Sequence, residues 1–231
     1  TSPDDPEVLA LYERVGREEG HEAALLDALT RRLVREPRAD MLREAVALAG
    51  KLAQKGAAEA QLRGFLAASA DAGRDDDRAW AYDALASLRL AAGDPEEGVA
   101  LKKRAAELAE PGAARDLAFE VAELAAGSLN DLALAASTYE ALLEKDPADR
   151  EAWEPLLDVY RRRPDAPKLA QLLGVVVDFV EDAEGRARLR LERVRVMMDD
   201  LGMGDAAADP LRDLVEEDPT QVEAALLLAG I

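Results

Sequence analysis

The chain has 231 residues, a net charge of −19 and no cysteine; 49% of its residues are hydrophobic and only 4% are aromatic. The acidic charge argues against binding to nucleic acid or to an anionic membrane, and the absence of cysteine excludes disulfide bonds and thiol catalysis. No apolar run approaches the ~20 residues of a membrane span, so we expect no membrane insertion. Abundant alanine and leucine predict an all-α fold.

The two ends of the sequence have the character of cut ends. The chain starts with TSPDDPEV, which contains neither an initiator methionine nor a signal peptide, and it stops with VEAALLLAGI inside an expected helix. We therefore expect a fragment of a longer protein. With no signal or transmembrane segment in it, a cytoplasmic location is favoured.

Two sets of residues recur along the chain with one period. The first set marks boundaries between units, at which proline follows Glu or Asp: Pro37, Pro111, Pro147 and Pro219. If Asp75 and Ala183 mark the two boundaries that lack such a proline, successive boundaries lie 36 to 38 residues apart. Helix-breaking residues fall 17 to 20 positions before each boundary: Gly20, Gly56, Gly93, Gly127, Pro164-Asp165 and Gly202. Glycine with positive φ ends one helix, and proline is tolerated where the next begins.

This period predicts six helix-turn-helix pairs within a single array. One pair cannot bury its own apolar face, so the core has to form between neighbouring pairs. The expected pairs span residues 3–36, 38–74, 76–110, 112–146, 148–182 and 184–218, and residues 220–231 form half a repeat. The exposed face of that last helix makes self-association through it an open alternative.

The segment 129–162 carries the most complete repeat. A small-residue helix is followed by a turn and by a second helix with large side chains, in the order Ala135, Tyr139, Pro147, Trp153, Leu156 and Tyr160. This pattern resembles the tetratricopeptide repeat family. The resemblance implies a right-handed α-solenoid of about six repeats plus one extra terminal helix. Leu157 stands where the family has glycine, and we expect Pro155 to kink its helix or delay its start.

No group of residues in the sequence predicts catalysis or metal binding. His21 is the only histidine, and a zinc site needs more ligands than it can supply. The acidic run 75–77 fits the start of a helix better than a calcium loop, because it lacks the central glycine and the closing glutamate. Gly202-Met203-Gly204 is expected to be a turn. We expect no enzyme activity and no cofactor.

The resemblance implies that helix positions 2, 5 and 9 of each first helix line a concave groove. In the third to sixth predicted pairs, the candidate partner-binding residues at these positions are Trp80, Asp83, Leu117, Glu120, Leu124, Glu151, Glu154, Asp158, Leu189, Glu192 and Val196. The acidic set of the fifth unit lies between two sets with apolar members, which predicts a partner segment with basic and apolar residues. The alternative is that the apolar residues pack between repeats and the acids form a solvated face.

A basic stripe on one helix is a second candidate site: Arg186, Arg190 and Arg193. It predicts either a local site for an anionic partner or pairing with neighbouring acids such as Glu184 and Glu192. The family's carboxylate clamp needs Lys and Asn at positions 5 and 9 of one helix, and no unit has that pair.

The sequence thus predicts a non-catalytic scaffold that binds a protein or peptide segment. Two alternatives remain. The chain could be the regulatory or substrate-recruiting region of a larger enzyme or signalling protein, or a pentatricopeptide-type RNA reader, against which the acidic charge argues.

Overall fold

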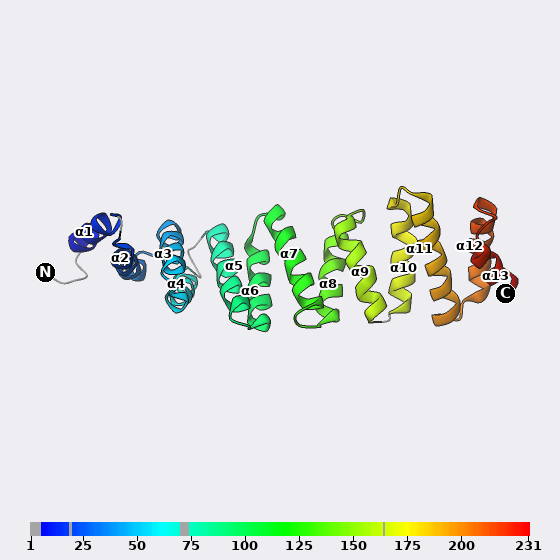
Figure 1. Ribbon diagram of the computed structural model, residues 1–231, viewed down its shortest axis with the longest axis horizontal. Coiled ribbons are helices and arrows are strands. Elements are labelled where there is room, and N and C mark those ends of the chain that lie inside the picture. Colours follow the sequence, from blue (N-terminus) through cyan, green and yellow to red (C-terminus); the bar gives the residue numbers. More distant parts are fainter. Residues whose placement is uncertain (1–5, 19, 70–73, 164) are drawn as a thin grey trace. The chain divides into compact units, whose positions relative to one another are not determined.

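The computed structural model describes residues 6–18, 20–69, 74–163 and 165–231 (Figure 1). Within these residues thirteen α-helices follow one another, and no strand occurs. The first residues of the predicted repeat 3–36, and Pro164 of the predicted helix-breaking pair Pro164-Asp165, lie outside the described residues. None of the described helices is long and apolar enough to cross a lipid bilayer.

The chain forms two compact units, residues 1–121 and residues 122–231. Successive helices of the first unit pack as neighbours, α1 on α2, α3 on α4, and α5 on α6. Its helices are α1 Pro6–Gly16, α2 Glu22–Arg35, α3 Ala39–Lys51, α4 Lys55–Ala68, α5 Asp75–Ala91 and α6 Pro95–Leu108, followed by the larger part of α7 Pro111–Ala126.

The second unit contains the end of α7 and the remaining helices. In it α8 packs on α9, α9 on α10, and α12 on α13 (Figure 1). The bounds are α8 Leu132–Leu143, α9 Arg150–Arg162, α10 Ala166–Val176 with the 3₁₀ turn η1 Val177–Phe179, α11 Ala183–Arg195 with the π-helical turn η2 Val196–Asp200, α12 Gly204–Glu217 and α13 Val222–Ala229.

Two helices fall in each of the six predicted pair ranges, to within one residue at their ends, and α13 falls in the range 220–231. The assignment of these pairs to repeats of one array remains a proposal.

Aspartate side chains start most helices of the second unit. Asp131, Asp149, Asp165 and Asp182 each accept a hydrogen bond from a backbone N–H in the first turn of α8, α9, α10 and α11. Such a cap satisfies one of the amide groups that have no partner within the helix. Pro111 begins α7, where its missing N–H costs nothing. Aspartate caps and, at α7, a proline thus mark these helix starts.

The core of each unit is built from leucine and small residues, with a few aromatic side chains. In the first unit Leu42, Leu62 and Leu85 are at most 1% exposed and pack around Phe65. In the second, the large side chains of the pattern that resembles the family are buried: Tyr139, Trp153, Leu156 and Tyr160 are 2–5% exposed. The large residues of the 129–162 pattern are therefore core residues.

The breaker residues were predicted correctly in three of the five glycine positions. Gly20, Gly93 and Gly202 have positive φ in turns between helices. The prediction was wrong for Gly56, which lies in the first turn of α4, and for Gly127, whose φ is not positive. In those two turns Ala53 (φ 55°) and Asn130 (φ 50°) take the left-handed conformation.

Pro155 lies inside α9 without delaying its start. The helix begins at Arg150, five residues earlier, and continues to Arg162. The acidic run 75–77 forms the first turn of α5, where carboxylates complement the helix dipole. Among the described residues no group of three or more His, Asp or Glu is placed to hold a metal ion.

Candidate partner-binding groove

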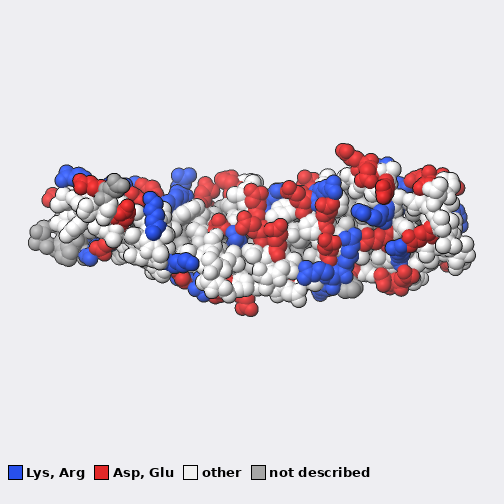
Figure 2. Space-filling model, in the orientation of Figure 1, with Lys and Arg blue, Asp and Glu red and all other residues white. Residues whose placement is uncertain are grey.

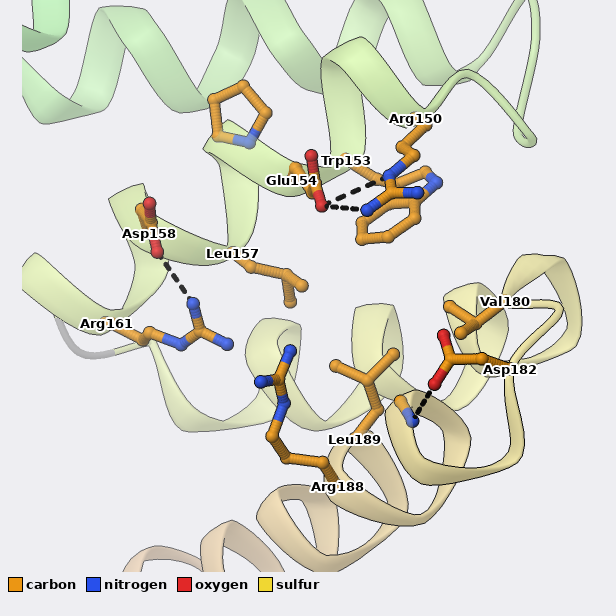
Figure 3. Close-up of a pocket in the computed structure, with 12 residues that line it drawn as sticks. Arg150, Trp153, Glu154, Leu157, Asp158, Arg161, Val180, Asp182, Arg188 and Leu189 are labelled. Atoms are coloured by element: carbon orange, nitrogen blue, oxygen red, sulfur yellow. Dashed lines mark hydrogen bonds and ion pairs between the residues drawn. The ribbon is translucent and has the colours of Figure 1, made fainter.

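A groove of about 450 Å³ lies between α9 and α11 in the second unit (Figure 3). We call it the α9–α11 groove. One wall comes from α9, the other from α11 and the turn before it. The lining residues are Arg150, Trp153, Glu154, Pro155, Leu157, Asp158, Arg161, Val180, Asp182, Gly185, Arg188 and Leu189.

The floor of the groove is apolar because the two helices turn their apolar stripes toward each other and toward the core. Trp153, Leu157 and Leu189 are 4%, 2% and 7% exposed. In α9 the charged residues Arg150, Glu154, Asp158 and Arg161 are spaced three or four positions apart from one another, so they share the solvent side of the helix and form the rim. A ligand in the groove would therefore meet apolar side chains below and charged side chains at the edge.

The α9 wall carries carboxylates that are paired with arginines. Glu154 Oε1 accepts hydrogen bonds from Arg150 Nε and Nη2 at 3.1 and 2.7 Å. Asp158 accepts one from Arg161 at 2.6 Å. The Arg150 guanidinium also lies 5.8 Å from the centre of the Trp153 ring. The wall is thus mixed in charge.

Arg161 joins the two walls. Its Nε and Nη2 each donate to an oxygen of Glu192 on α11, both at 2.8 Å. This hydrogen-bonded pair raises the pKa of Arg161 above its ordinary value, against the opposing effect of burial. The fork-to-fork geometry is the strong form of an arginine–carboxylate contact, so it fixes the spacing of α9 and α11 at this point.

The α11 wall carries one acid and one arginine with different roles. Asp182 caps α11 by accepting a hydrogen bond from the backbone N–H of Gly185 at 2.5 Å. Arg188 is exposed and has no hydrogen-bond or ion-pair partner among the described residues. Figure 3 shows its guanidinium extending between the two helices, on the side where Arg161 also points.

The groove brings together three of the residues that the sequence predicted for the fifth and sixth units: Glu154, Asp158 and Leu189. Glu192 reaches its rim through Arg161. Glu151 is exposed on α9 outside the lining, and Val196 is 7% exposed within η2. Val196 is thus as buried as Leu189 but lies outside the lining.

The predicted residues of the other units have different surroundings. Lys102 of α6 is 4% exposed, and its Nζ lies 2.5 Å from a carboxylate oxygen of Asp83 and 2.5 Å from one of Glu120. Trp80 is half-buried, with the Arg43 guanidinium 4.9 Å from its ring centre. Leu117 and Leu124 on α7 are half-buried.

The basic stripe of α11 is largely engaged. Arg186 donates to the carbonyls of Val180 and Glu181, and Arg190 donates to both oxygens of Glu217 at 2.7 Å. Arg193 is exposed and has no partner among the described residues. Its guanidinium packs against Gly174 of α10, because a Cβ at Gly174 would lie 2.9 Å from the Cζ of Arg193. On the visible face of this unit, acidic and basic side chains are interleaved (Figure 2).

Sequence reasoning did not single out Arg150, Arg161 or Arg188 as groove residues, nor Lys102 as the partner of Asp83 and Glu120. The spacings from Arg150 to Glu154 and from Asp158 to Arg161 are the i,i+4 and i,i+3 spacings at which helical ion pairs form. These spacings could have predicted both ion pairs from the sequence. The contacts of Arg161 and Lys102 cross between helices, and no spacing along one helix predicts them.

Solved structures share this arrangement of helices. The chain is similar to the Naa15/Naa10 complex bound to HypK-THB, with 15% identity over 96% of this chain and a TM-score of 0.56. The helical hairpins and this match decide the fold. The chain has a tetratricopeptide-repeat fold.

Other similar structures are the tetratricopeptide-repeat protein YrrB, with an unusual peptide-binding site, and MamA. YrrB matches at 15% identity over 87% of this chain and 97% of its own, with a TM-score of 0.46, and MamA at 15% over 76% and 93%, with a TM-score of 0.49. This chain spans 38% of the length of the matched Naa15/Naa10 chain. No protein-family model and no curated protein matches the sequence.

Proposed function

We propose that the chain is a non-catalytic scaffold that binds a segment of a partner protein in the α9–α11 groove. The observation that carries this proposal is the groove itself, about 450 Å³ in volume and lined by Glu154, Asp158 and Leu189, three residues expected from the repeat pattern to contact a partner. Grooves with an apolar floor and a charged rim suit the recognition of a peptide segment.

The α9 wall suits a segment with basic residues beside apolar ones. The side chains of the Arg150–Glu154 pair are 74% and 52% exposed, so the pair is worth only a few tenths of a kcal/mol and a partner's cation can replace Arg150. Asp158 can be released at similarly small cost, because Arg161 keeps its two hydrogen bonds to Glu192. An apolar side chain of the partner would rest on Leu157 and Leu189.

A charge reversal of this wall tests the proposal. Glu154→Lys/Asp158→Lys places two cations on the α9 wall and changes the net charge by +4. Asp209→Lys/Asp213→Lys is the matched control, because these two exposed acids have the same i,i+4 spacing on α12 and make the same change of charge outside the groove.

The measurement is a pull-down from source lysate with the unmodified chain and both variants, after circular dichroism has shown equal helicity. We expect a protein that is retained by the unmodified chain and by the α12 control and lost by the α9 variant. Equal retention by all three would place binding elsewhere and contradict the proposal.

A further inference from the structure

We propose that the partner segment also carries an acidic side chain, which binds Arg188. This inference rests on the proposed function and adds the chemistry of the second wall. The segment would then present a basic residue to α9, an apolar residue to the floor and a carboxylate to α11.

The inference starts from which hydrogen-bonding groups of the groove already have partners. Each acid in the lining accepts at least one hydrogen bond: Glu154 from Arg150, Asp158 from Arg161, and Asp182 from the backbone of Gly185. Arg150 and Arg161 donate theirs to these acids and to Glu192. Among the described residues of the lining, Arg188 is the charged group without a partner.

A second donor of the lining also has no acceptor. Trp153 is 4% exposed, and its indole Nε1 is buried with no hydrogen-bond partner. A buried N–H without an acceptor carries a desolvation cost. Because this N–H is buried, the unpaired donor that a ligand can reach in the groove is the exposed Arg188 guanidinium, and a ligand that brings an acceptor complements it. A carboxylate is the strongest acceptor in a protein segment.

Arg188 and Arg193 are the two arginines of α11 without a partner among the described residues, and of the two only Arg188 lines the groove. The chain has 48 acidic residues against 29 basic ones, and Arg190 and Arg195 of the same helix each reach a glutamate while Arg186 reaches two carbonyls. Arg188 faces the groove and meets no acid there, although three acids line it. Its guanidinium is therefore free to receive a carboxylate in two-pronged geometry.

The surroundings of Arg188 restrict the residue next to that carboxylate. Leu189 follows Arg188 in α11, and Leu157 faces it across the floor (Figure 3). An acidic side chain on Arg188 thus places the adjacent residue of the segment over apolar side chains. A large apolar residue there would exclude water from the ion pair and strengthen it.

Two synthetic peptides test this arrangement. They share one flexible Gly/Ser frame and a fluorescein label and differ in one position, Lys-Leu-Glu in the first and Lys-Leu-Gln in the second. Fluorescence anisotropy with the full chain gives the two dissociation constants. We expect the Glu peptide to bind about tenfold more tightly, as a charged hydrogen-bonded pair does over a neutral one.

Arg188→Gln should remove this preference and leave the binding of the Gln peptide unchanged. Arg193→Gln is the matched control: it lies on the same helix, is exposed, has no partner among the described residues and loses the same charge, but lies outside the groove. It should keep the tenfold preference.

Equal binding of the two peptides by the unmodified chain, or an unchanged preference in Arg188→Gln, would overturn the inference. If both peptides bind equally and both are lost in Glu154→Lys/Asp158→Lys, the proposed function stands while the inference fails. If neither peptide binds, both fail.

Discussion

Arg162 donates a hydrogen bond of 3.0 Å to the backbone carbonyl of Ala126, a residue 36 positions earlier in the chain. The same nitrogen lies 3.0 Å from Oδ1 of Asn130, whose backbone is in the left-handed conformation. The end of α9 thus holds the turn between α7 and α8. Its separation of 36 residues equals the step between boundary residues in the sequence, and the contact joins the end of α9 to the end of α7.

Replacing Arg162 with alanine should loosen that turn. Arg162→Ala removes both hydrogen bonds and leaves the Ala126 carbonyl to water, and we expect a loss of about 1 kcal/mol in the free energy of unfolding of the second unit. Urea denaturation followed by circular dichroism measures it. Arg163→Ala is the control, because Arg163 is exposed and has no partner among the described residues. Equal losses in the two variants would contradict the prediction.

Lys102 makes a second contact between helices, and removing its charge should cost more. Burial alone would lower the pKa of Lys102, but the hydrogen bonds to Asp83 and Glu120 raise it above the ordinary value. Lys102→Met leaves the two carboxylates close together without a cation, so we expect the first unit to lose about 2 kcal/mol of stability. Thermal and urea unfolding measure the loss.

Two further variants separate charge from packing at Lys102. Lys103→Met changes the exposed neighbour, which has no partner among the described residues, and should leave stability within about 0.5 kcal/mol of the unmodified chain. Lys102→Met/Asp83→Asn/Glu120→Gln removes the repulsion and should recover most of the loss. Failure of this triple variant to recover stability would show that packing of the lysine stem, not its charge, is what matters.

The sequence predicted the fold well because the fold depends on local signals. Three kinds of signal each act within one or two helices: Pro111 at the start of α7, an aspartate before most helices of the second unit, and the buried aromatic residues of 129–162. Their spacing along the chain therefore indicates the number and position of the helices. The groove was predicted only in part. Glu154 and Asp158 follow from helix positions, whereas Arg188 and Arg161 acquire their roles from residues on another helix.

Glu140 links α8 to α9 and α10 and should make the stability of the second unit depend on pH. Its Oε1 accepts hydrogen bonds from Tyr160 at 2.5 Å and Lys168 at 2.6 Å. Burial alone would raise the pKa of Glu140, but the hydrogen bonds from Lys168 and Tyr160 lower it by more than burial raises it. The pKa of Glu140 therefore lies below the ordinary 4.5. A carboxyl with a depressed pKa stabilises the fold above its unfolded-state pKa, and this contribution is lost as the pH falls through the folded-state value.

We therefore expect Glu140→Gln to lower the free energy of unfolding by about 1 kcal/mol at pH 7 and by progressively less below pH 4.5. Urea denaturation at pH 7, 5, 4 and 3 measures the difference. Glu144→Gln is the control. Glu144 lies four residues after Glu140, is exposed and has no side-chain partner among the described residues, so its variant should show no such pH dependence. A constant difference for Glu140→Gln from pH 7 to 3 would refute the role given to its charge.

The turn between α3 and α4 lacks the glycine that its backbone favours. Ala53 has φ 55°, a left-handed conformation that costs an alanine about 1 kcal/mol or more, while Gly56 occupies a helical position in α4 where a Cβ would meet no atom within 4 Å. Glycine at 53 removes that strain at the expense of chain entropy, and alanine at 56 removes the flexibility that glycine adds to a helix.

We expect Ala53→Gly and Gly56→Ala each to stabilise the first unit by about 0.5–1 kcal/mol. The two positions lie only three residues apart, so the double variant measures the coupling between them. Thermal unfolding of the three variants checks this. Gly93→Ala provides the opposite sign: Gly93 has φ 84°, and alanine there should destabilise the turn between α5 and α6. Destabilisation by Ala53→Gly would mean that the turn does not hold residue 53 in the left-handed conformation.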